Sequence, residues 1–197
     1  LGDVYKRQTI AKAKFTKTID NTNLILNIFH GDIDNGYDAF SLDNTRVTYS
    51  DNPGHDRQKT TATSLKIERD LKGNNRLEAL ISYAESDLNY AYDEDWSNTD
   101  ICNNTPCDSS IHGFDWWYSS FDSFKRDNKN HTLDIRYVYD SENFPWVIGI
   151  YNRGQDINLI RQYTYLENDF KSSFDTKNSA IYCLLYTSPS PRDCRLS

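Results

Sequence analysis

Polar and apolar residues alternate along several stretches of the chain with the two-residue period of a β-strand. The clearest stretch is 77–84, where alternate positions are apolar or aromatic: Leu77, Ala79, Ile81 and Tyr83. The positions between them are Glu78, Leu80, Ser82 and Ala84. Because successive side chains of a strand point to opposite faces of a sheet, this pattern predicts strands with one apolar and one polar face.

The same pattern, bounded by turn-forming residues, predicts seven strands. They cover 9–18, 24–33, 57–70, 76–90, 124–139 and 145–160, and a seventh begins near 176. Short polar turns lie at 20–23, 72–75 and 140–143, and long polar connections lie at 34–56, 91–123 and 161–175. Strands joined in this way predict an all-β fold, an antiparallel up-and-down meander.

The strict alternation of short and long connections favours one all-β architecture over another. Outer-membrane β-barrels combine short periplasmic turns with long extracellular loops, whereas compact soluble domains rarely contain long structureless loops. The predicted strands also exceed the usual length of about five or six residues. We therefore expect part of a transmembrane β-barrel. A soluble β-sandwich, whose strands also alternate, is the alternative.

In such a barrel one face of each strand meets lipid and the other faces a water-filled lumen. The charged residues expected in the lumen are Lys66, Glu68, Glu78, Asp134 and Arg136. The apolar residues expected to join 77–83 on the lipid side are Leu65, Ile67, Leu133, Ile135, Tyr137 and Tyr139. In the sixth strand the pattern leaves two sets open, Trp146, Ile148 and Ile150 against Val147, Gly149 and Tyr151.

Composition agrees with half-buried strands and polar loops. The 197 residues include 14 Tyr, 9 Phe and 4 Trp but no Met, and the net charge is −7. That acidic balance argues against nucleic acid as a partner, since phosphate binding needs clustered Lys and Arg. No apolar run approaches the roughly 20 residues of a membrane helix, but barrel strands need only about 10 alternating residues.

Both ends of the chain match translated sequencing-adapter DNA. Residues 3–8, Asp-Val-Tyr-Lys-Arg-Gln, can be encoded by GAT GTG TAT AAG AGA CAG, a transposon end used in sequencing libraries. Residues 183–188, Cys-Leu-Leu-Tyr-Thr-Ser, read back as its reverse complement, and 189–193 continue as neighbouring adapter. We therefore expect a biological segment from about Thr9 to Tyr182, with 1–8 and 183–197 excluded from fold reasoning. A natural Pro- and Ser-rich tail is the alternative.

Removing the adapter residues Cys183 and Cys194 leaves one pair of cysteines, Cys102 and Cys107. Four residues separate them, whereas a thioredoxin-type motif has two. Zinc would need further ligands, and His112 alone does not complete a set. We expect a short disulfide-closed loop, which implies an oxidising compartment, and two unpaired thiols are the alternative.

Aromatic residues bracket this cysteine loop and are the candidate ligand contacts: Trp96, Trp116, Trp117 and Tyr118. They fit a surface that stacks on a sugar or siderophore, a girdle at the membrane interface, or packing of the loop on itself. The run Asp93-Glu94-Asp95 offers carboxylates for a cation or for acid–base chemistry, although an acidic solvated loop is far more common.

Signatures of catalysis or of a resident cofactor are lacking in the sequence. The four histidines share no spacing, and neither a Gly-rich phosphate loop nor a serine nucleophile elbow appears. We therefore predict no enzyme activity, no metal site and no cofactor.

Six segments resemble stretches of TonB-dependent outer-membrane receptors. The first, 35–44, reads Asn-Gly-Tyr-Asp-Ala-Phe-Ser-Leu-Asp-Asn. The others are Asp51-Asn52-Pro53-Gly54-His55-Asp56, residues 60–65, residues 82–87, residues 92–96 and residues 161–166. They occur in the family's order, and the resemblance covers nearly all of residues 9–182.

This resemblance implies part of a receptor in the outer membrane of a Gram-negative bacterium. The expected activity is active uptake of a scarce nutrient of the siderophore, vitamin or oligosaccharide class through a plugged barrel of about 22 strands. The implied partners are outer-membrane lipid, a small-molecule ligand and the TonB complex, which contacts a plug domain outside this segment. A passive porin-like channel and a soluble extracellular β-domain that binds carbohydrate remain the alternatives.

Overall fold

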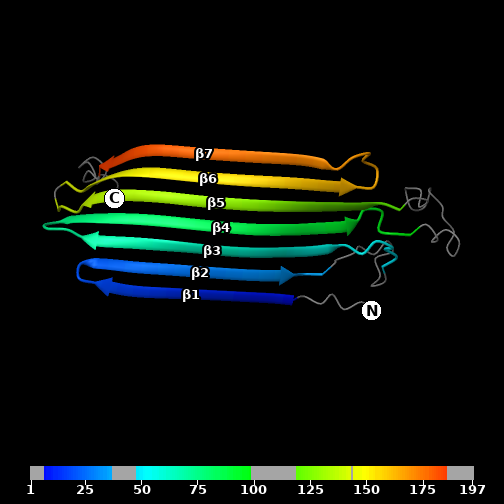
Figure 1. Cartoon of the computed structure of the whole chain (residues 1–197), viewed down its shortest axis with the longest axis horizontal. Helices are drawn as coiled ribbons and strands as arrows, with labels where there is room; N and C mark the ends of the chain where they lie inside the picture. Colours follow the sequence, from blue (N-terminus) through cyan, green and yellow to red (C-terminus); the bar gives the residue numbers. More distant parts are fainter. Residues whose placement is uncertain (1–6, 37–47, 99–118, 143, 186–197) are drawn as a thin grey trace, which may run out of the picture.

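The computed structural model describes residues 7–36, 48–98, 119–142 and 144–185, which form one antiparallel sheet in strand order β1 to β7 (Figure 1). The strands are β1 (Arg7–Ile19), β2 (Thr22–Asp34), β3 (His55–Asp70), β4 (Asn75–Asp93), β5 (Phe121–Tyr139), β6 (Trp146–Tyr163) and β7 (Phe170–Leu185). Each strand pairs with its neighbours in sequence. The prediction of an all-β up-and-down meander is therefore confirmed.

The connections divide between the two ends of the strands. At one end, called here the turn end, lie residues 20–21, 71–74, 140–142 and 144–145. At the opposite end, the loop end, lie the described residues 35–36, 48–54, 94–98, 119–120 and 164–169. The left–right arrangement of Figure 1 separates these two ends.

One predicted connection is wrong. We expected 161–175 to be a long connection, but β6 continues to Tyr163 and β7 begins at Phe170. Residues 170–175 lack a regular apolar alternation, yet they pair with β6 from Arg161↔Phe170 to Asp156↔Asp175. Residues 170–175 therefore form a strand because their backbone pairs with β6, although their side chains show no strand pattern. The last connection is thus short, and the strict alternation of short and long connections does not extend to it.

The register separates the strands' side chains into two faces. Directly paired residues share a face, so the row Leu65↔Ile81 and Ile81↔Leu133 lies on one side. The row Glu68↔Glu78 and Glu78↔Arg136 lies on the other. We call these the aliphatic face and the polar face. The positions named from the sequence in β3, β4 and β5 are therefore separated as predicted, with Leu65 and Ile81 on one face and Glu68 and Glu78 on the other.

The sixth strand now has an assigned orientation. Ile148 lies opposite Tyr137 and Ile150 lies opposite Ile135, so both are on the aliphatic face. Gly149 lies opposite Arg136 on the polar face. The register therefore selects Trp146, Ile148 and Ile150 as the apolar set.

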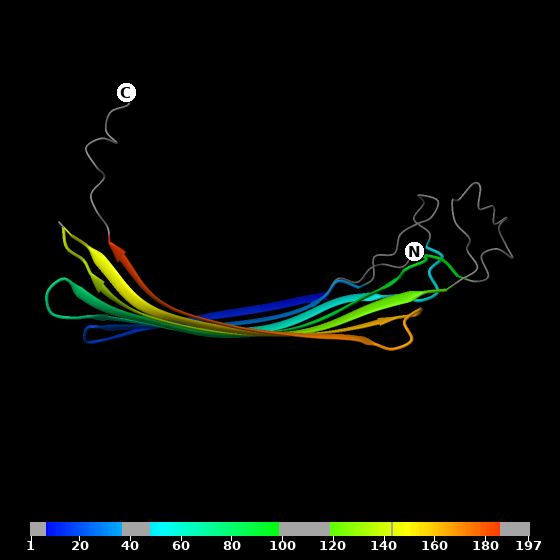
Figure 2. The same ribbon diagram turned by 90° about the horizontal axis from the view of Figure 1, so that it is seen from above.

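Very few apolar side chains of the described residues are buried. Ala91 and Val147 are the only buried apolar side chains among these residues. The sheet is a single curved layer (Figure 2). The exposed large side chains on the aliphatic face include Phe15, Ile19, Ile28, Leu77, Ile81, Tyr83, Ile148, Ile150 and Ile181. This differs from a sandwich, in which a second sheet covers the inner face.

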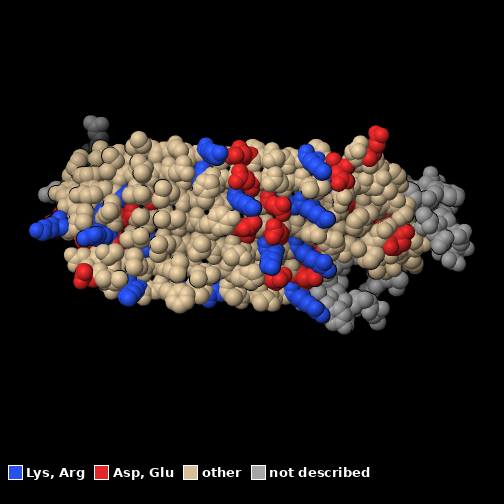
Figure 3. Space-filling model, in the orientation of Figure 1, with Lys and Arg blue, Asp and Glu red and all other residues tan. Residues whose placement is uncertain are grey.

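Charged residues occupy the part of the aliphatic face nearer the loop end. Figure 3 shows them as a band of alternating sign across the strands, with a largely uncharged area towards the turn end. Two of the paired rows that form this band are Lys59↔Asp87 and Glu85↔Lys129. Lys129 Nζ lies 3.4 Å from Glu85 Oε1. The face thus changes from aliphatic to ionic along β3, β4 and β5.

On the polar face, near the turn end, Glu78 is the centre of an ionic cluster. Its carboxylate is 4% exposed and accepts hydrogen bonds from Arg76 Nε and Arg136 Nε, each at 2.6 Å. Nearby, the Tyr182 hydroxyl donates to Asp134 Oδ1 at 2.7 Å. Charged groups predicted to face water are therefore on one side of the sheet and pair with one another.

Among the described residues no helix is long and apolar enough to cross a membrane.

The paired strands include Arg7, Gln8 and residues 183–185, which the sequence assigns to adapter DNA. Backbone pairing accepts almost any side chain, so the adapter origin of these residues stays a prediction.

Candidate functional site

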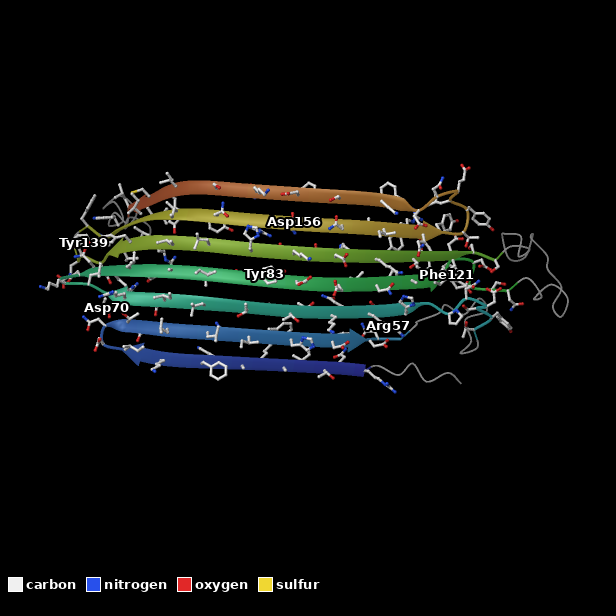
Figure 4. All side chains as sticks on the ribbon, viewed as in Figure 1. Arg57, Asp70, Tyr83, Phe121, Tyr139 and Asp156 are labelled. Carbon is white, nitrogen blue, oxygen red and sulfur yellow. The ribbon has the colours of Figure 1, made fainter. Side chains whose placement is uncertain are left out.

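Three chain segments from two connections meet at the loop end, near Phe121 in Figure 4. The Asp51 amide donates to the Ser97 carbonyl at 3.0 Å, and the Glu94 amide donates to the Ser120 carbonyl at 3.1 Å. The side-chain amide of Asn98 donates to the Tyr49 carbonyl at 2.8 Å. These bonds join residues 49–52, 94–98 and 119–121 into one assembly.

Gly54 allows the first of these segments to approach β4 closely. A Cβ atom at this position would lie 1.9 Å from the Ala91 carbonyl oxygen and 2.7 Å from the Tyr92 Cα. Both neighbours are backbone atoms, which cannot rotate away. Glycine is therefore required where 49–54 crosses the end of β4.

Three carboxylates gather within this assembly. Asp51, Asp93 and Asp95 each offer one oxygen, and these oxygens lie within 4.8 Å of one another. Asp51 is exposed, whereas Asp93 is fully buried and Asp95 is 5% exposed. Ser97 and Ser120, at 0% and 1% exposure, lie in the same buried assembly. The cluster is thus a set of oxygen donors partly withdrawn from water.

The buried member Asp95 has an altered acidity. The Ser120 amide donates to its Oδ1 at 2.8 Å, which favours the ionised form. Burial and the neighbouring Asp93 carboxyl outweigh that bond and raise the pKa of Asp95 to about 6. A carboxyl group with such a pKa is easily neutralised by a proton or by a bound cation.

A second polar network lies beside the carboxylates, on the polar face. Asp122 is 1% exposed and accepts two bonds from Arg161, Nε to Oδ1 at 2.9 Å and a terminal guanidinium nitrogen to Oδ2 at 2.7 Å. The Tyr92 hydroxyl donates to the same carboxylate at 3.3 Å. The Arg161 guanidinium also lies 5.2 Å from the ring centroids of Phe124 and Tyr163. This network ties β4, β5 and β6 together.

Replacing Asp122 by alanine is expected to lower the free energy of unfolding by about 2 kcal/mol, because hydrogen bonds to a charged group are lost and Arg161 loses its partner. Asp156, exposed in the middle of β6, is the control. Asp156→Ala should change stability by less than about 0.5 kcal/mol. Urea unfolding in detergent measures both, and equal effects would contradict the role given to Asp122.

The predicted site residues are only partly covered by the structure. Trp96 is half-buried beside Asp95 and has a positive φ of 56°. Trp116, Trp117, Tyr118, Cys102 and Cys107 lie outside the described residues, so stacking by these rings and the disulfide both stay predictions.

Comparison with known proteins does not assign a family. No protein-family model matches the chain, and no curated protein is significantly similar to it. Function is therefore argued from the sheet and from the loop-end assembly.

The structure adds residues that sequence reasoning missed. Asp93 and Asp95 were noticed as an acidic run, but Asp51 is far from them in sequence and no spacing rule connects them. The Ser120 amide donates to Asp95 and its hydroxyl donates to Glu94, and no sequence pattern predicted either contact. The turn signal Pro53-Gly54 was the one hint that 49–54 is held in a defined position.

Proposed function

We propose that the chain is a segment of an outer-membrane β-barrel receptor of the TonB-dependent class, which takes up a scarce small nutrient. The aliphatic face is the observation that supports a location in the membrane. Its large apolar side chains are exposed on a single-layer sheet, as in Ile81 at 49% and Ile150 at 48%. Each Å² of apolar surface exposed to water raises the free energy by about 25 cal/mol relative to burial. Lipid removes that cost.

The length of the strands supports the same placement. An apolar band about 25 Å tall requires only about 10 residues of a tilted strand. β4 and β5 have 19 residues each, with their aliphatic residues towards the turn end and their charges towards the loop end. Under this proposal the turn-end half crosses the hydrocarbon and the charged half extends beyond it.

The polar face fits a water-filled lumen. Placing the charged side chains around Glu78 in lipid hydrocarbon would cost several kcal/mol of free energy, as for other charged residues in membranes. Farther along the same face lie the small polar pairs Ser82↔Thr132 and Ser86↔Asn128. The open edges at β1 and β7 are places where further barrel strands would pair.

The receptor part of the proposal is supported by where the family-like segments lie. Of the six segments that resemble the receptors, 51–56, 92–96 and 161–166 all reach the loop end. Asp51 bonds to Ser97, and Tyr92 and Arg161 bond to the same carboxylate, that of Asp122. Residues distant in sequence thus meet at the loop end, which under this proposal is the side on which barrel receptors contact their ligands.

The placement of the two faces is tested with single cysteines at Ile81 and Ser82, adjacent positions on opposite faces. Cys102, Cys107, Cys183 and Cys194 are replaced by serine in both variants. A polarity-sensitive dye at position 81 should be quenched by a quencher held in the acyl chains of phosphatidylcholine vesicles, and a dye at position 82 should not. Equal quenching, or no association with vesicles, would overturn the barrel.

The receptor is distinguished from a passive channel by sequencing the locus in the source DNA. The expected result is that the adapter codons vanish and that a plug domain with a secretion signal precedes the barrel. A reading frame that closes near Thr9 with a secretion signal and no plug would contradict the receptor and leave a small porin-like channel.

A further inference from the structure

The three carboxylates at the loop end are placed as ligands of a single ion would be. They come from two separate connections and from the last residue of β4, and their nearest oxygens lie within 4.8 Å of one another. Two of the three, Asp93 and Asp95, are almost fully withdrawn from water. Negative charges so close and so poorly hydrated repel one another, and a cation between them removes that repulsion.

An independent observation points to a ligand. Asp95 is 95% buried, and its Oδ1 accepts from the Ser120 amide at 2.8 Å, but its Oδ2 has no hydrogen-bond partner among the described residues. Buried polar atoms nearly always have a partner in folded proteins. The backbone therefore fixes one oxygen of this carboxylate and leaves the other, beside the Asp93 carboxyl, without a donor from the described residues.

The chemistry of the donors selects the kind of ion. All three are carboxylate oxygens, and the buried hydroxyl of Ser120 lies 3.4 Å from Asp95 Oδ1. Soft metals favour sulfur and imidazole, whereas an all-oxygen set suits Ca²⁺ or Mg²⁺. Ca²⁺ accepts irregular sets of six to eight oxygens, and Mg²⁺ demands near-ideal octahedral geometry. Ligands contributed by loops favour Ca²⁺.

We propose that Asp51, Asp93 and Asp95 bind one Ca²⁺ ion, which ties the segment 49–52 to the ends of β4 and β5. The ion would act where hydrogen bonds already join these segments, Asp51 to Ser97 and Glu94 to Ser120. This inference is independent of the receptor proposal, since it rests on the loop end alone and would hold for any protein built on this sheet.

The full chain, refolded in detergent and treated with a chelator, is titrated with CaCl2 by calorimetry. We expect one bound ion per chain, with a dissociation constant in the range of about 10⁻⁷ to 10⁻³ M that sensor and extracellular calcium sites span. Tb³⁺ provides a second readout, because Trp96 follows Asp95 directly and can sensitise its luminescence. Trp96→Phe should lower that luminescence without changing calcium binding.

Three variants give the assignment its test. D93N/D95N keeps side-chain shape and removes two charges, so it should fold, resist unfolding in chelator as well as the wild type does, and lose calcium binding at least 30-fold. D51N changes an exposed residue and should weaken binding about 10-fold. D156N/D175N, which removes two exposed carboxylates from β6 and β7, should bind as the wild type does.

The outcomes are distinct. Loss of binding in D93N/D95N and D51N, with binding retained in D156N/D175N, supports the site. The proposal fails if the wild type binds no Ca²⁺ at a concentration 10-fold above about 10⁻³ M, the weak end of the range for extracellular calcium modules. It also fails if D51N binds with wild-type affinity, or if Mg²⁺ binds as tightly as Ca²⁺. Calcium binding with no vesicle association would overturn the receptor proposal and leave this one intact.

Discussion

Replacing Ile81 by arginine is expected to lower the stability of the chain in lipid vesicles by about 2–4 kcal/mol, the cost of a cationic side chain on the lipid face near the bilayer midplane. Ile81 lies in the middle of the aliphatic rows, between Leu65 and Leu133, and is 49% exposed. Its side chain has no charged partner in those two neighbours. The guanidinium would therefore enter hydrocarbon unpaired.

The neighbouring position supplies a matched control. Ser82 is on the polar face opposite Ser64 and Thr132, so an arginine there would point into water. Ser82→Arg should change stability by less than about 1 kcal/mol. Both variants are compared by urea unfolding from vesicles, and separately in aqueous buffer without lipid. If the two arginines cost the same in vesicles, the aliphatic face does not meet lipid.

Much of this architecture could be predicted because the residues that define it are local. The alternation from Leu77 to Tyr83 assigns the faces of β4, and the turn residues Lys72 to Asn75 limit where β3 ends. Register then follows from pairing, since a slip of one residue would exchange the aliphatic and polar faces. The orientation of β6, which its own sequence left open, is determined in the same way by β5.

The features that sequence reasoning missed depend on contacts between distant segments. Residues 170–175 are mostly polar and lack a pattern, and they are strand because β6 offers them unpaired backbone groups. Asp51 joins Asp93 and Asp95 only because 49–54 folds back over the end of β4. No local pattern carries that information, so the candidate cation site emerged from the structure, while the acidic run alone indicated a solvated loop.

Replacing Gly54 by alanine is expected to separate the segment 49–54 from β4 and to disorder the loop-end assembly. The added methyl carbon would lie 1.9 Å from the Ala91 carbonyl oxygen, and relief requires the backbone to move. Overpacking of this kind costs about 1–3 kcal/mol, and occasionally more. Because Asp51 lies on the displaced segment, Gly54→Ala should also weaken calcium binding without altering a carboxylate.

Gly31 in β2 provides the comparison. A Cβ there would meet only the Phe29 ring, at 3.2 Å, and a ring can shift by the small amount required. Gly31→Ala should therefore be neutral or stabilise the chain by up to about 1 kcal/mol, because alanine restricts the unfolded state. Limited proteolysis within 48–54, followed by mass spectrometry, should show faster cleavage in Gly54→Ala and wild-type cleavage in Gly31→Ala. Unchanged cleavage in Gly54→Ala would mean that the close approach to β4 does not hold this segment, and the convergence of the three carboxylates would lose its structural cause.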